Sequence, residues 1–308
     1  MSSGSKKVII AALLGNALIS VTKFTAAVFT GSSAMLSEGI HSLVDTGNQI
    51  LLLYGMKQAE KPADENYPFG HGKEIYFWSF IVAILIFALG GGISIYEGIH
   101  HVLHPVEITD PFINYIVLGF ALIFEGAAWY FALREFNKSK GKWGYVDAVK
   151  RAKDPSVFVV LFEDSAAMLG LLVAFFGILL TQITGILYLD GVASIIIGLI
   201  LISTAIWLAY ETKGLLIGES ANKPVVQGIR LVLQHNENIE IVNEVLTMHM
   251  GPNFILANIS VDFKDNLTSE ELEKCIAELD LAIKYKYPLV QRVFIEAERA
   301  GSKNSRKS

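Results

Sequence analysis

Long apolar stretches separated by short polar loops fill the first two thirds of the chain. A helix needs roughly 20 residues to cross about 30 Å of hydrocarbon, and six stretches reach that length. They lie at residues 8–30, 34–55, 75–102, 112–134, 157–181 and 187–210. This pattern predicts an α-helical membrane protein with six transmembrane helices in a domain of residues 1–212.

From about Glu219 the pattern becomes that of a small soluble domain. Residues 225–234 have helical periodicity, and residues 244–249 and 254–263 alternate like strands around a Gly-Pro-Asn turn. Thr268 or Ser269 is expected to cap an amphipathic helix that runs to about Lys286, and residues 290–296 are expected to form a last strand. The order α, β, β, α, β suits a small α+β domain with two helices on one face of its sheet, at residues 213–300.

The composition supports a membrane protein and excludes several other classes. The 308 residues are 52% hydrophobic and 18% charged. A single cysteine excludes an intrachain disulfide framework and a cysteine-based zinc finger. The net charge of −5, with no basic block interleaved with aromatic residues, argues against binding of nucleic acid. The small, polar and basic residues 301–308 are predicted to be disordered.

Lysine and arginine fall in alternate loops. The loops near residues 31–33, 104–111 and 182–185 contain neither, whereas the other loops and the start of the chain are basic. By the positive-inside rule, both termini are expected in the cytoplasm. The first apolar stretch is predicted to be a membrane helix rather than a cleaved signal, and the host membrane is predicted to be a bacterial inner membrane.

Three ionisable residues mark the second apolar stretch. Glu38, His41 and Asp45 are spaced i, i+3 and i+7, so a helix presents them on one face. Each costs roughly 2.5 to 3.5 kcal/mol at bilayer depth, so their presence indicates a use. The sequence favours a metal or proton site over a buried polar cluster that only bonds neighbouring helices.

A second acidic pair, Glu163 and Asp164, lies in the fifth stretch. Adjacent helical residues diverge by about 100°, so one of the two carboxylates is expected to meet His41 and Asp45. Imidazole with carboxylate suits zinc, and a set richer in oxygen favours manganese or ferrous iron. Because ligands lose protons when they bind metal, metal and protons compete for such a site.

Two further features leave alternatives open. Lys23, inside the first stretch, either extends toward an interface or pairs with Glu38 or Glu125. A group of three histidines ends the third stretch, at His100, His101 and His104. They could release or capture metal, but the more favoured alternative is that they only interact with the dipole at the end of the helix.

Several motifs in a fixed order resemble the cation diffusion facilitator family. They are HSLVDTGNQ in the second stretch, PFGHGK at residues 68–73 and SIYEGIHHVLHP at residues 94–105, followed by the α+β tail. The combination of SEGIHSLVDTGNQ with FEDSAA is most similar to the branch that includes the mitochondrial zinc transporter of animals. The resemblance covers nearly the whole chain.

This resemblance implies a proton-coupled antiporter that exports zinc, or alternatively manganese or iron, from the cytoplasm. It further implies a homodimer with ferredoxin-like cytoplasmic domains, and a transport site at His41, Asp45 and Asp164. Val160 stands where many zinc transporters of the family have histidine or aspartate, so either Glu163 or water is the fourth ligand. Lys73 matches a lysine that forms a salt bridge between protomers, for which Glu219 is a loosely aligned partner.

The resemblance also implies accessory metal sites. In the loop after the second stretch, Asp64 and His71 match family ligands, but Tyr67 replaces a possible histidine. In the soluble domain the candidates are His249, Glu296 and Glu298, with His235 as an addition that has no family match.

Three other function classes fit the sequence less well than a transporter. An intramembrane metalloenzyme needs a motif such as HExxH, which the sequence lacks, so the protein is not predicted to be an enzyme. A channel needs a continuous polar stripe through several helices, whereas the polar residues concentrate in two. A regulator with a degenerate transport site stays an alternative, because Val160 replaces a ligand found in many transporters of the family.

Overall fold

The computed structural model describes residues 3–107 and 111–299. Contacts within the chain divide it into two compact units. The helical unit contains the residues up to Glu60 together with Glu74–Lys213, and the sheet unit contains Lys61–Lys73 together with the residues from Gly214 onward. The domain limits at residues 212 and 300 stay predictions, and the tail at 301–308 lies outside the described residues.

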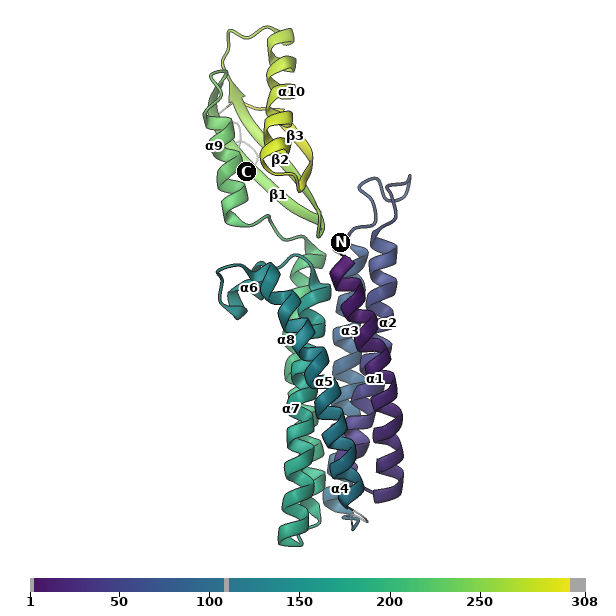
Figure 1. Ribbon diagram of the computed structural model, residues 1–308. Coiled ribbons are helices and arrows are strands. Elements are labelled where there is room, and N and C mark those ends of the chain that lie inside the picture. Colours follow the sequence, from purple (N-terminus) through teal and green to yellow (C-terminus); the bar gives the residue numbers. More distant parts are fainter. Residues whose placement is uncertain (1–2, 108–110, 300–308) are drawn as a thin grey trace. The chain divides into compact units, whose positions relative to one another are not determined.

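The helical unit consists of long helices that lie side by side (Figure 1). The main helices are α1 (Ser3–Thr30), α2 (Ser33–Ala59), α3 (Glu74–Leu85), α4 (Ile93–Leu103), α5 (Pro111–Lys140), α7 (Pro155–Thr184) and α8 (Tyr188–Ile217). Between α3 and α4 the chain forms a π-helical segment, η1 (Ile86–Gly92), and the short helix α6 (Tyr145–Arg151) precedes α7.

Five helical segments among the described residues are long and apolar enough to cross a membrane, which makes the chain a multi-pass membrane protein. The predicted second span, α2, is a helix of 27 residues but is not among the five. Its buried polar side chains, such as Glu38, His41 and Asp45, lower its apolar content. The five segments are Leu13–Thr30, Glu74–Leu103, Pro111–Lys138, Phe158–Thr184 and Tyr188–Ile217.

Local signals fix the ends of the two helices that carry the predicted ligands. Gly31 has a φ of 71°, and the Ser32 side chain accepts a hydrogen bond from the backbone N–H of Met35 to cap α2. Asp154 caps α7 at its start, and Gly185, with a φ of 72°, ends it in the left-handed conformation. The register of both helices is therefore set by residues outside the site.

Helix α4 packs closely against α8 through glycine. A methyl group on Gly98 would lie 2.7 Å from the carbonyl oxygen of Gly191, and one on Gly191 would lie 2.8 Å from that of Gly98. The two backbones therefore touch directly, as small residues allow between membrane helices.

The sheet unit contains α9 (Lys223–Gln234), β1 (Ile239–Gly251), β2 (Phe254–Phe263), α10 (Ser269–Lys286) and β3 (Val290–Ala297). The strand order is β1-β2-β3, with β1 and β2 antiparallel and β2 and β3 parallel. The predicted element order is confirmed. Strand β1 begins earlier than predicted because irregularities between Ile239 and Glu244 interrupt the alternation used to recognise strands.

The sheet packs its apolar face against both helices (Figure 1). Thr268 and Glu271 form the capping box of α10, and hydrogen bonds from the Thr268 backbone and hydroxyl lower the pKa of Glu271. On the other face, Leu246 and Phe294 are 53% and 44% exposed. The buried core includes Ile229, Leu233, Val245, Ala257, Ile259, Val261, Cys275, Leu279 and Ile283.

The contact between α4 and α8 predicts opposite effects for two Gly→Ala substitutions. In Gly98→Ala the new methyl group meets the Gly191 carbonyl, and overpacking of this kind costs about 1–3 kcal/mol. In Gly119→Ala, within α5, nothing lies within 4 Å of the new methyl group, so the better helix propensity of alanine prevails. Thermal unfolding in detergent, followed by circular dichroism, should show a lower midpoint for Gly98→Ala alone. Equal midpoints would contradict the close packing.

Candidate functional site

One face of α2 buries a row of polar side chains. His41, Asp45 and Asn48 are 1%, 3% and 0% exposed. The Nδ1 atom of His41 lies 3.3 Å from Oδ1 of Asp45, one helical turn further along. The predicted pairing of His41 with Asp45 on one face of a buried helix is therefore present.

Helix α7 places both acidic residues of its pair in the interior. Glu163 is 1% and Asp164 is 5% exposed. Asn48 Nδ2 donates a hydrogen bond of 2.5 Å to Glu163 Oε1, and the carboxyl groups of Glu163 and Asp45 lie within hydrogen-bonding range of each other. Asp164 lies within electrostatic range of Asp45. Glu163, rather than Asp164, makes the direct contact with α2.

Asn48 was missed by the sequence reasoning, which considered only ionisable groups. It follows Asp45 by three residues and His41 by seven, so it continues the same helical stripe. Extending the periodicity to neutral amides would have found it.

Many nitrogen and oxygen atoms of these side chains have no hydrogen-bond partner within the described part of the chain. Buried polar atoms without partners are costly, and a bound cation or protons would satisfy acceptors of this kind. Across residues 3–107 and 111–299, however, no three such side chains surround one point closely enough to hold a metal ion. The cluster contains side chains of the types that bind metal, but these side chains must move closer together to bind one ion. The unpartnered atoms are His41 Nδ1 and Nε2, Asp45 Oδ1, Asn48 Oδ1, Glu163 Oε2 and Asp164 Oδ2.

Val160 is also buried, at 1% exposure. It precedes Asp164 by four residues, so the two side chains leave α7 on the same face. A residue at position 160 is thus placed next to the carboxylate that the family resemblance assigns to the site.

Lys23 is the centre of a buried ion cluster next to this site. Its Nζ atom donates hydrogen bonds to Glu38 Oε2 at 2.9 Å, Glu125 Oε1 at 2.8 Å and Ser42 Oγ at 2.9 Å. An ammonium group has three N–H donors, so all of them are used. Lys23 therefore pairs with both of the carboxylates considered from the sequence and joins α1, α2 and α5.

Asp190 links the beginning of α2 to α8. Its carboxylate accepts hydrogen bonds from Ser32 Oγ at 2.8 Å, from Ser33 N at 2.6 Å and from Ser33 Oγ at 2.8 Å. A carboxylate at the N-terminus of a helix is favoured by the free N–H groups there. Nothing in the sequence singled out this residue, because its partners lie far away in the chain.

The predicted loop site is partly assembled. His71 Nε2 lies 2.9 Å from Asp64 Oδ2, and the ring of Tyr67 packs against that of His71. The hydrogen bond with His71, followed by that from the Tyr67 backbone, holds the pKa of Asp64 below its ordinary value. Nearby, Lys73 Nζ lies 3.7 Å from the sulfur of Met248.

The candidates in the sheet unit do not come together within one chain. His249 is buried and pairs with Ile255, whereas Glu296 pairs with Ser260, five residues further along β2. At about 3.3 Å per residue the two positions are far apart. Glu298 accepts a hydrogen bond from Ser260 Oγ at 2.7 Å, and the His235 ring contacts the carbonyl of Leu231.

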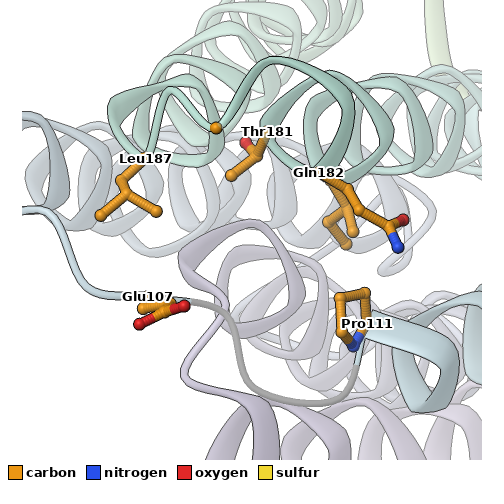
Figure 2. Close-up of a pocket in the computed structure, with 7 residues that line it drawn as sticks. Glu107, Pro111, Thr181, Gln182 and Leu187 are labelled. Carbon is orange, nitrogen blue, oxygen red and sulfur yellow. The ribbon is translucent and has the colours of Figure 1, made fainter.

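A cavity of about 430 Å³ lies at the end of α7, away from these residues (Figure 2). It contains none of the predicted ligands. Its lining consists of Glu107, Pro111, Ile178, Thr181, Gln182, Gly185 and Leu187.

Imidazole and carboxylate groups buried inside a bundle of apolar helices are typical of membrane proteins that move cations. The sequence matches the model of the cation efflux transmembrane domain over residues 9–217, and the chain belongs to that family of transporters.

Curated relatives agree with this membership. The chain is 35% identical over 283 residues to a Xenopus laevis protein named proton-coupled zinc antiporter SLC30A9, mitochondrial, covering 91% of this chain and 50% of the relative. It is 33% identical over 274 residues to the human protein of that name, covering 88% of this chain and 48% of the relative. The chain thus spans about half the length of these relatives. The manganese efflux system protein MneP of Bacillus subtilis is 23% identical over 297 residues, covering 94% of this chain and 95% of the relative.

The ion cluster predicts a large loss of stability in Lys23→Met. Removing the ammonium leaves Glu38 and Glu125 buried without their partner, and breaking a buried pair in this way costs about 3–5 kcal/mol. Adding Glu38→Gln and Glu125→Gln removes the unpaired charges and should restore much of the thermal unfolding midpoint. The control is Lys138→Met, because that lysine is 63% exposed. A Lys23→Met protein as stable as this control would contradict the cluster.

Proposed function

We propose that the protein exports a divalent transition metal, zinc first, in exchange for protons. The observation that carries this proposal is the burial of His41 and Asp45 on α2 beside Glu163 of α7, with Asp164 within electrostatic range of Asp45. The relatives named as proton-coupled zinc antiporters support this proposal. The metal is the cargo of the site.

The side chains proposed as ligands suit zinc, but they also suit other divalent metals. One imidazole with carboxylate oxygens is a common zinc environment. The excess of carboxylates over imidazoles also suits manganese or ferrous iron, and the manganese efflux relative supports that alternative. Glu163 is proposed as the fourth ligand, and its contact with Asp45 supports this assignment.

Proton exchange follows from the crowding of carboxyl groups. Two buried carboxylates within hydrogen-bonding range repel each other strongly unless a proton or another cation lies between them. A metal ion that enters from the cytoplasm would displace protons from Asp45, Glu163 and Asp164. After the helices rock to expose the site on the other side, protons would displace the metal.

We propose six membrane crossings, with α2 as the sixth. Its length of 27 residues and the burial of its polar face support this assignment. The basic loops support cytoplasmic termini. A bacterial inner membrane is kept as the proposed location, although the relatives named as mitochondrial give it no support.

We further propose a homodimer with ferredoxin-like cytoplasmic domains. Leu246 and Phe294, exposed on the sheet face away from α9 and α10, support a contact with a second copy. Lys73 is proposed to form a salt bridge between protomers. Accessory metal binding at Asp64 and His71, or at His249, Glu296 and Glu298, also remains part of the proposal.

A regulator that no longer transports is the second candidate function, and Val160 at the transport position favours it. The regulator would fold and dimerise but move no metal. The same transport experiment separates the two candidates.

The first experiment is metal uptake by purified protein in vesicles with an imposed pH gradient. Uptake of zinc should collapse when the gradient is dissipated. Asp45→Asn should lower the rate by at least about tenfold, since even the loss of groups that support metal ligands has effects of that size. Asp147→Asn, an exposed aspartate in α6, is the matched control. Equal rates in Asp45→Asn and the control would contradict the site, and no uptake by folded wild-type protein would favour the regulator.

A second experiment tests the face on which Val160 lies. Val160→His adds an imidazole beside Asp164 and should shift preference toward zinc over manganese, because imidazole suits zinc better. Val160→Ala is the control, since it changes volume without adding a ligand. Competition between the two metals in the vesicle assay gives the preference. If both variants have the same preference, position 160 does not face the metal.

A further inference from the structure

A stripe of histidines lies on α4, at the end of the helical unit opposite the start of α3. His100, His101 and His104 follow Glu97 at i+3, i+4 and i+7, so the four side chains share one side of the helix. His104 is the C-cap residue, and its backbone N–H bonds to the carbonyl of His100. None of these residues belongs to the transport site described above.

The two outer rings are close together and exposed. The ring centroids of His100 and His104 are 5.1 Å apart with an interplanar angle of 33°, and both side chains are exposed. His101 is half-buried, and its ring centroid lies 6.2 Å from that of His100. Favourable interaction with the helix dipole requires histidine near the C-terminus, but it does not require two rings to face each other.

Two imidazoles one helical turn apart are a known arrangement for metal binding. Neutral imidazole nitrogen prefers zinc, copper and nickel among the divalent ions, and histidines at i and i+4 on one helix reach the same ion. Within the described parts of the chain no third His, Cys, Asp or Glu converges with this pair. Water would fill the remaining positions, so the site would be weak and quickly exchanging.

We propose that His100 and His104 form a surface site for a divalent zinc-, copper- or nickel-class ion. The lysine-free loop that follows α4 places it on the membrane face opposite the basic loops. A weak site at this position would hold metal near the face on which exported ions appear. Its existence does not rest on the proposed transport activity.

The test measures Cu²⁺ and Zn²⁺ binding to the full chain carrying Asp45→Asn and Asp164→Asn, which removes two of the four proposed transport-site ligands. In this background, Cu²⁺ bound weakly at His100 and His104 should give an electron paramagnetic resonance spectrum with two imidazole nitrogens. His100→Ala or His104→Ala should weaken binding by about tenfold or more, because the second imidazole of a pair acts at high effective concentration. His235→Ala is the matched control, since His235 is exposed and lies four residues beyond Leu231 with no histidine partner there.

Unchanged Cu²⁺ binding in the double variant His100→Ala/His104→Ala would overturn the proposal. A second measurement uses the chain without these two substitutions, so it does not depend on how the variants fold. Zn²⁺ should protect His100 and His104 from modification by diethyl pyrocarbonate more than it protects His235. Equal modification with and without Zn²⁺ would also overturn the proposal. The two histidines would then only interact with the dipole at the end of the helix.

Discussion

The structure depends on how it keeps charged groups stable inside apolar helices. Lys23, Glu38 and Glu125 are all buried, and each would be costly in hydrocarbon on its own. The ammonium group satisfies its three donors with two carboxylates and the Ser42 hydroxyl, and so ties three helices together. One carboxylate remains in excess, which gives the interior next to His41 a negative charge when both glutamates are ionised. That charge favours a cation in the same region.

Helix α2 is where these constraints meet. Asp190 of α8 holds its first turn, Lys23 of α1 holds its middle, and Glu163 of α7 bonds to Asn48 one turn beyond the candidate ligands. The polar residues that lower its apolar content are the same ones that connect it to its neighbours. A movement of α7 relative to α2 would break the bond between Glu163 and Asn48 and change the distance between Asp45 and the acidic pair. The candidate site therefore lies at a contact between two helices.

The sequence allowed the elements and part of the site to be predicted, because those features are local. The capping signal at Thr268 located α10, and the spacing of His41 and Asp45 put them on one face of α2. Pairings between distant segments were harder, because periodicity says which face is polar but not which helix lies opposite. Adjacent residues on α7 were expected to diverge, so that one carboxylate would meet α2. Both Glu163 and Asp164 are buried and Glu163 bonds to Asn48 of α2, but the sequence did not say which of the two carboxylates this would be. Asp190 was overlooked because its partners lie on a distant segment. Helix α6 was overlooked because seven residues make too few turns to show a periodic pattern of apolar residues.

Helices α2 and α7 are proposed to bind a divalent metal together. Anomalous diffraction at the zinc absorption edge, from crystals of the protein grown with zinc, would locate the ion directly. An anomalous peak is expected within bonding distance of His41, Asp45 and at least one of Glu163 and Asp164, and it should be lost in His41→Ala/Asp45→Asn crystals. Zinc peaks elsewhere on the protein, with none between α2 and α7, would contradict this proposal.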